Sequence, residues 1–123
     1  MPTEPEPVTL SEVVHRAVVV VDPDGHEGLD DFLERFADDD EPLSSVRADI
    51  VRQRIAEGVG ALDPQEEDGA VQMAGAVATY LAYRRDEVDV EAGALLELAA
   101  RAEFDGDPPD VVRRWLADTG IEL

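Results

Sequence analysis

The sequence predicts an all-α protein, a compact bundle of five to six short helices in a single domain. Apolar residues recur at helical spacing in several segments, and clusters of Pro, Gly and Asp separate these segments. No pair of segments carries a convincing β-hairpin signal. A length of 123 residues favours one domain, and a hydrophobic content of 44% is enough for a core. Because aromatic residues make up only 5%, Ala, Val and Leu must build that core.

The first helix is predicted over residues 10–21, after a flexible, acidic and Pro-rich leader over residues 1–8. Thr9 and Glu12 have the spacing of a capping box. The apolar stripe that follows consists of Leu10, Val13, Val14, Ala17, Val18 and Val21. Residues 18–21, at the end of this predicted helix, are all β-branched, so a short buried strand is the alternative there. Residues 9–123 are expected to form the helical domain.

Two further helices are expected between residues 27 and 62. The second covers about 27–37, and an acidic run followed by Pro42 ends it. Its apolar residues are Leu29, Phe32, Leu33 and Phe36. Ser44 or Ser45 is predicted to cap the third helix. The residues expected to face inward on that helix are Val46, Ile50, Val51, Ile55, Val59 and Leu62.

The fourth helix is predicted to run from Pro64 to about Glu87. Asp63 offers an N-cap, Pro64 suits the first helical position, and Glu66 completes the capping pattern. One face carries only small residues, namely Ala70, Ala74, Ala78 and Ala82, with Gly75 beside them. Small side chains allow close approach of neighbouring helices, so this helix is expected at the centre of the bundle.

Two shorter helices complete the expected bundle. Asp89 is predicted to cap the fifth, whose apolar residues are Leu95, Leu98, Ala99 and Ala102. A break over 105–109 precedes the sixth, which carries Val111, Val112, Trp115 and Leu116. Gly120 and Ile121 then fit the end of a helix closed by a Schellman motif.

The charge of the chain is unusual. Thirty acidic residues face ten basic ones, all of them Arg, for a formal net charge of −20. Typical soluble domains carry about 2 to 8 charges of one sign in excess. Salt screens the self-repulsion of such a chain, so the composition favours a protein from a salt-accumulating halophile. The alternatives are an acidic protein of a GC-rich bacterium and an acidic protein that meets a basic partner.

The composition also excludes several functions. Without Cys, the chain has no disulfide, thiolate metal site or Cys nucleophile. The first residues lack the basic region of a signal peptide, and the longest apolar run, 17–21, is far too short for a membrane helix. We therefore expect a soluble, cytoplasmic protein without membrane contact.

No catalytic, metal-binding or cofactor-binding residue stands out. The two histidines, His15 and His26, lack partners at ligand spacing. The Asp-rich segments 22–25 and 105–107 do not continue into a calcium-binding loop. The serines lie at expected helix caps, and no phosphate-binding Gly loop occurs. We therefore expect no cofactor, and an enzyme that uses carboxylates and a divalent cation is only the third hypothesis.

The leading hypothesis is a non-enzymatic helical module that acts by protein–protein contact, with a partner or as a homodimer. Val19 and Val20 widen the apolar stripe of the first helix, which should be buried on most sides or shared with a partner. The candidate partner surface, for an acidic partner or a second copy, consists of Arg47, Arg52, Arg54, Arg84 and Arg85. Pairing of these Arg residues with carboxylates of the same chain is the favoured alternative.

A DNA-binding regulator is the second hypothesis. Residues 95–119 read as helix, short turn, helix, which in outline resembles a helix-turn-helix. Arg113 and Arg114 would then contact the nucleic acid. Asp107 and Asp110 flank the start of that second helix, and the net charge opposes the electrostatic part of DNA binding.

Overall fold

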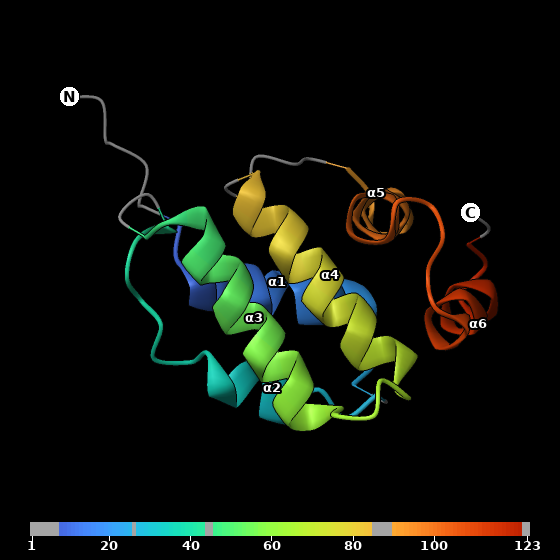
Figure 1. The fold of residues 1–123 in the computed structure, drawn as a ribbon, viewed down its shortest axis with the longest axis horizontal. Helices are drawn as coiled ribbons and strands as arrows, with labels where there is room; N and C mark the ends of the chain where they lie inside the picture. Colours follow the sequence, from blue (N-terminus) through green and yellow to red (C-terminus); the bar gives the residue numbers. More distant parts are fainter. Residues whose placement is uncertain (1–7, 26, 44–45, 85–89, 122–123) are drawn as a thin grey trace.

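The computed structural model describes residues 8–25, 27–43, 46–84 and 90–121, and these form an all-helical bundle (Figure 1). Its helices are α1 (Leu10–Val21), α2 (Asp30–Arg35), α3 (Ala48–Leu62), α4 (Gly69–Tyr83), α5 (Ala92–Phe104) and α6 (Asp110–Asp118). Within these described ranges there is no strand, only one isolated antiparallel bridge between Thr9 and Pro42. The predicted fold class is confirmed.

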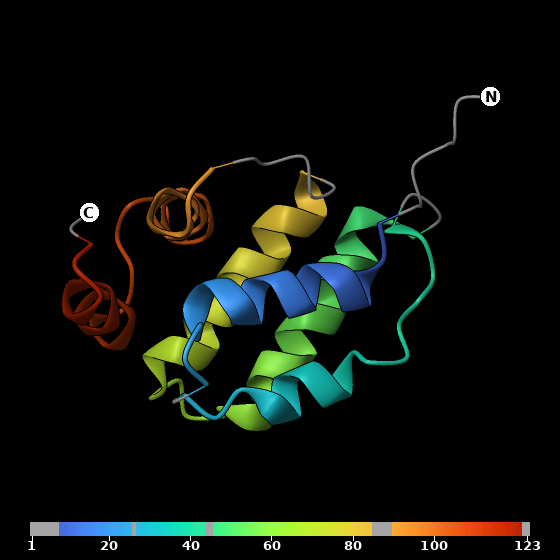
Figure 2. The same ribbon diagram turned by 180° about the vertical axis from the view of Figure 1, so that it is seen from behind.

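Helix α4 lies at the centre of the bundle, as its small residues predicted. It packs against α1, α3, α5 and α6. From behind, α1 crosses α4 and α3, and α2 lies against the lower part of α3 (Figure 2). Two glycines of α4 permit close approach of the neighbouring helices. A Cβ added at Gly69 would lie 2.5 Å from the Val111 carbonyl oxygen of α6, and a Cβ added at Gly75 would lie 2.4 Å from Val59 Cγ2 of α3. Small side chains thus bring α6 and α3 close to the central helix.

Helix α1 forms as its local signals predicted. The Thr9 hydroxyl accepts a hydrogen bond from the Glu12 backbone N–H at 3.3 Å, and all six residues of the predicted stripe are buried. The helix continues through Val21, so the strand alternative is wrong. Val20 is partly buried, but Val19 is 51% exposed and His15 is exposed. One face of α1 is therefore open within this chain, and the alternative expectation, that a partner shares this helix, stays a prediction.

The predicted starts of three helices are wrong. Helix α2 begins only at Asp30, because Gly28 adopts a left-handed conformation with φ +68° just before it. Helix α3 begins at Ala48 with Arg47 at the N-cap, and α5 begins at Ala92 with Glu91 there, neither with a side-chain cap. The predicted capping residues Ser44, Ser45 and Asp89 lie outside the described residues.

Helix α4 also begins later than predicted, at Gly69 rather than Pro64. Asp68 caps it, since its Oδ1 accepts from the backbone N–H groups of Ala70 at 3.0 Å and Val71 at 3.3 Å. Asp63 follows the end of α3 instead, and Glu66 has a left-handed φ of +55° that interrupts any helix there. The segment from Asp63 to Asp68 is therefore a turn between α3 and α4.

The buried face of α5 differs from the predicted one, whereas the predicted end of α6 is confirmed. The buried residues of α5 are Leu95, Leu96, Ala99 and Ala100, whereas Leu98 and Ala102 of the predicted face are exposed. At the end of α6, the Ile121 N–H donates to the Leu116 carbonyl at 2.8 Å and the Gly120 N–H to that of Ala117 at 3.0 Å. This pair of bonds, with Gly120 at φ +89°, confirms the predicted Schellman motif.

Across the described ranges, no helix has both the length and the hydropathy needed to cross a bilayer.

Candidate functional site

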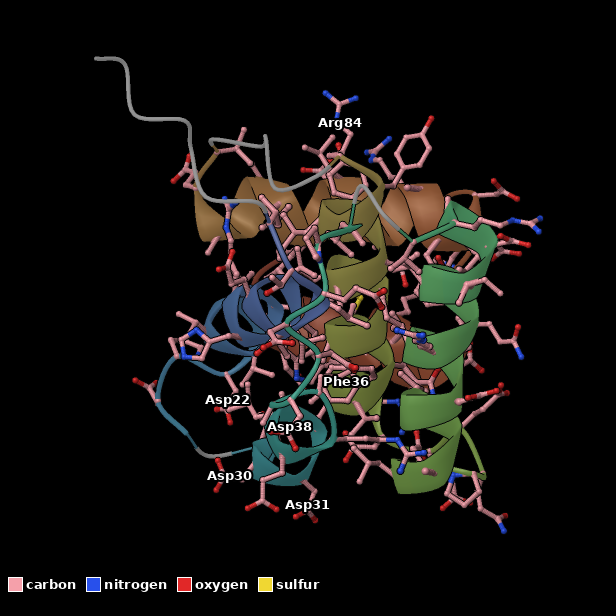
Figure 3. The ribbon with its side chains drawn as sticks, turned by 90° about the vertical axis from the view of Figure 1, so that its left-hand side faces the viewer. Asp22, Asp30, Asp31, Phe36, Asp38 and Arg84 are labelled. Atoms are coloured by element: carbon pink, nitrogen blue, oxygen red, sulfur yellow. The ribbon has the colours of Figure 1, made fainter. Side chains whose placement is uncertain are left out.

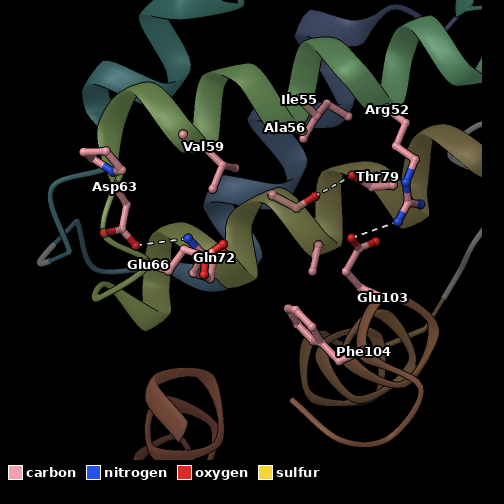
Figure 4. Close-up of a pocket in the computed structure, with 14 residues that line it drawn as sticks. Arg52, Ile55, Ala56, Val59, Asp63, Glu66, Gln72, Thr79, Glu103 and Phe104 are labelled. Atoms are coloured by element: carbon pink, nitrogen blue, oxygen red, sulfur yellow. Dashed lines mark hydrogen bonds and ion pairs between the residues drawn. The ribbon is translucent and has the colours of Figure 1, made fainter. Parts of the chain in front are cut away.

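A groove opens along α4 on the side that α1 and α2 do not cover. Three adjoining cavities of about 320, 380 and 250 Å³ form it, and Arg52 and Thr79 line all three. We call the combined feature the α4 groove. Its walls come from α3 and α5 and its floor from α4 (Figure 4). Residues that define it are Arg52, Ala56 and Val59 of α3, Ala76, Thr79 and Tyr83 of α4, and Glu103 and Phe104 of α5.

The floor of the α4 groove follows from the sequence of α4. Ala76, Thr79 and Tyr83 lie about one helical turn apart, so they share one face of the helix. The Thr79 hydroxyl donates to the Gly75 carbonyl of its own helix at 2.8 Å. Its hydrogen-bonding capacity as a donor is therefore used locally, so the floor at Ala76 and Thr79 is small and offers no free hydroxyl donor.

An ion pair joins the two walls across the floor. Arg52 Nη2 lies 3.0 Å from Glu103 Oε1, which links α3 to α5 (Figure 4). The side chains are 61% and 27% exposed, so solvent screens their attraction. Such exposed pairs typically contribute at most about 1 kcal/mol. The pair is therefore weak enough for another charged group to replace either partner.

One end of the α4 groove contains a buried carboxylate. Asp63 is 7% exposed and accepts hydrogen bonds from the backbone N–H groups of Glu67 at 2.9 Å and Asp68 at 2.8 Å, and from Gln72 Nε2 at 3.1 Å. Burial raises the pKa of the Asp63 carboxyl, but the bonds from Gln72, Asp68 and Glu67 together hold that pKa below its ordinary value. Both oxygens are engaged, so this carboxylate fixes the turn between α3 and α4.

The opposite end of the α4 groove is apolar. Its cavity of about 380 Å³ has Leu43, Val46, Val51 and Ala82 among its lining residues. Tyr83 lines the same cavity and is 77% exposed, the highest value among the large exposed hydrophobic residues of the described chain. An exposed aromatic ring beside an apolar cavity is a typical feature of protein interfaces.

The lining of the α4 groove is acidic on balance. Asp49, Asp63, Glu66 and Glu103 contribute carboxylates, and Arg52 contributes a guanidinium. Arg47 adds a second guanidinium through its 3.1 Å contact with Asp49.

Charged side chains also gather away from the α4 groove. Asp30, Asp31 and Asp38 lie around α2, whereas Arg84 extends from the other end of the molecule (Figure 3).

Three of the five Arg residues predicted as a partner surface pair with carboxylates of the same chain. Arg47 pairs with Asp49 at 3.1 Å, Arg52 with Glu103 at 3.0 Å and Arg54 with Glu41 at 3.9 Å. This outcome agrees with the favoured alternative of internal pairing. Arg84 is exposed after the end of α4, and Arg85 lies outside the described residues.

Arg113 and Arg114, the residues of the DNA-binding hypothesis, both lie exposed on α6. Arg113 pairs with Asp107 at 2.8 Å, and Arg114 is exposed next to it on α6. The DNA-binding hypothesis stays a prediction. Among the described residues, no three His, Cys, Asp or Glu side chains are placed to hold a metal ion. His26 lies outside them.

We compared the chain with protein-family models, curated proteins and solved structures. None of the three comparisons gave a match. Sequence analysis missed Thr79, Tyr83 and Glu103. Thr79 and Tyr83 follow Gly75 at four-residue spacing beside the small face of α4, which is a weak signal. Glu103 lies 51 residues from Arg52 and has no local signal at all.

Proposed function

We propose that the protein is a non-enzymatic helical module that binds another protein through the α4 groove. The observation that carries this proposal is Tyr83, 77% exposed at the rim of an apolar cavity on the uncovered side of the central helix. Tyr is over-represented among the residues that dominate binding energy at interfaces. A second copy of the chain is the alternative occupant of the groove, and the test below separates the two.

The chemistry of the α4 groove supports binding rather than catalysis. The hydrogen bonds of Asp63 occupy both of its oxygens, and Glu103 is paired with Arg52. The described lining residues include neither His nor Ser. Asp63, the buried carboxylate of the lining, could therefore act as a general base only by giving up these hydrogen bonds.

We also propose that the protein works in a salt-rich cytoplasm. A net charge of −20 on 123 residues supports this, because the Debye length falls from about 10 Å at 0.1 M salt to about 3 Å at 1 M. The helical circular dichroism signal should therefore be retained at 2 M salt and reduced in dilute buffer. A full signal at very low ionic strength would contradict this part of the proposal.

The binding proposal is tested by affinity capture from native, high-salt lysate of the source organism. Tyr83→Ala should lose the captured protein, because it removes the exposed ring. Leu98→Ala is the control, since Leu98 is also an exposed large hydrophobic residue but lines none of the three cavities. Equal capture by both variants and by the unaltered protein would contradict the proposal. Sedimentation of the purified protein in high salt as a dimer that Tyr83→Ala dissociates would identify the second copy as the occupant.

A further inference from the structure

We infer that the α4 groove takes a basic amphipathic helix, with apolar residues on one face and Lys or Arg beside them. This inference rests on the proposed function and names the class of partner. Three observations carry it: the spacing of the floor residues, the charge of the lining, and the weak ion pair that crosses the groove.

The floor has the spacing that a helix can match. Ala76, Thr79 and Tyr83 stand at relative positions i, i+3 and i+7 of α4, and each lines at least one of the three cavities. A helix that lies in a groove inserts anchors at the same i, i+3 or i+4, and i+7 spacing. Adjoining cavities along α4 therefore suit successive apolar side chains of a single helix.

The charge of the lining favours a basic partner. The lining holds three solvent-accessible carboxylates, those of Asp49, Glu66 and Glu103, but only one guanidinium, that of Arg52. At a Debye length of about 3 Å in 1 M salt, charges act mainly through direct contact, and contacts of opposite charge discriminate between partners. An acidic helix would have to compete with Asp49 and Glu103 for Arg residues that are already paired.

The Arg52–Glu103 ion pair must open for the partner helix to bind. The pair joins α3 to α5 above Thr79, so a helix along α4 displaces the Arg52 side chain. Arg52 is 61% exposed and free to swing outward. A Lys or Arg of the partner then replaces it on Glu103. Arg52→Ala should thus tighten binding by at least threefold, because the competing guanidinium is gone.

The probe is a synthetic 18-residue peptide with Leu on one helical face and Lys on the other. Two comparison peptides carry Glu in place of Lys, or the same Leu and Lys residues in scrambled order. Titration calorimetry is done in the salt at which circular dichroism shows the full helical signal. The basic amphipathic peptide should bind at least tenfold more tightly than either comparison peptide. Equal binding of the scrambled peptide would overturn the inference, since it would show attraction by charge alone.

Two pairs of variants test whether the peptide binds in the α4 groove. Ala56→Trp places a bulky ring in the cavity of about 320 Å³ and should weaken binding at least tenfold. Ala61→Trp is the control, because Ala61 is exposed on the same helix outside the lining, and it should not weaken binding. Arg54→Ala is the control for Arg52→Ala, because it changes the charge equally but lies outside the lining.

The two proposals fail in different ways. Binding of the Glu peptide, abolished by Ala56→Trp, would overturn the basic partner and leave the groove as a binding site. Binding that neither Ala56→Trp nor Tyr83→Ala changes would overturn both, because the probe would then bind elsewhere.

Discussion

The two sides of α4 differ in what covers them. Toward α1, the contact is closed: Val13, Val14 and Ala17 of α1 are fully buried, as are Ala78 and Leu81 of α4. On the other side, α3 and α5 stand apart over a floor that ends in the exposed Tyr83, and none of the residues that line the three cavities comes from α1 or α2. One helix thus stabilises the fold with one side and leaves the other available for contact.

The largest expected effect tests this division within α4 itself. Leu81→Ala should lower the free energy of unfolding by about 2–5 kcal/mol, because it leaves a cavity at a fully buried position. Tyr83→Ala, two residues away, should change it by no more than about 0.5 kcal/mol. Urea unfolding in high salt measures both. A large loss of stability in Tyr83→Ala would show that the groove side also holds the fold together.

The closeness of α6 to α4 gives the next effect. Gly69→Ala should destabilise the protein by about 1–3 kcal/mol, since the new Cβ would lie 2.5 Å from the Val111 carbonyl oxygen and 2.7 Å from Trp115 Cβ. Gly93→Ala is the control, because nothing lies within 4 Å of a Cβ there. It should stabilise the protein by about 0.4–1 kcal/mol through the unfolded chain. Thermal unfolding distinguishes the two signs.

The stabilisation that the Asp63 carboxylate gives to the turn between α3 and α4 depends on pH. Its pKa is lowered in the folded state, so its contribution is complete at neutral pH and is lost as the pH falls below about 5. Asp63→Asn should therefore cost about 1–2 kcal/mol near pH 7 and progressively less in acid. The difference between the two proteins, measured by urea unfolding across this range, isolates Asp63 from the other carboxylates. A difference independent of pH would contradict the role of the charge.

The smallest effect concerns the ion pair across the groove. Glu103→Gln should change the free energy of unfolding by less than about 1 kcal/mol, because the Arg52–Glu103 pair is exposed and screened. A larger loss in urea unfolding would mean that the pair clamps α3 to α5 and that the groove is part of the structural core.

Where local signals agreed with one another, the sequence was sufficient to predict the structure. The cap at Thr9 and the stripe up to Val21 both lie within α1, and both are confirmed. The start of α4 was mispredicted because Asp63 and Asp68 each offer a cap, and the left-handed conformation of Glu66 decides between them.

The α4 groove could not be predicted because it depends on distant parts of the chain. Nothing near Arg52 in sequence indicates that Glu103 is its partner. The exposure of Tyr83 likewise depends on which helices cover α4, and neither periodicity nor composition contains that information. The internal pairing of the Arg residues, by contrast, follows from the excess of carboxylates and was the favoured expectation.

The central position of α4 has a consequence for hydrogen exchange. Because α4 packs against α1, α3, α5 and α6, its backbone amides become accessible only when those contacts are broken together. The amide protons from Met73 to Leu81 should exchange with deuterium as one cooperative unit, at the rate set by global unfolding. Those of the six-residue α2, which contacts only α1 and α3 closely, should exchange earlier through local opening.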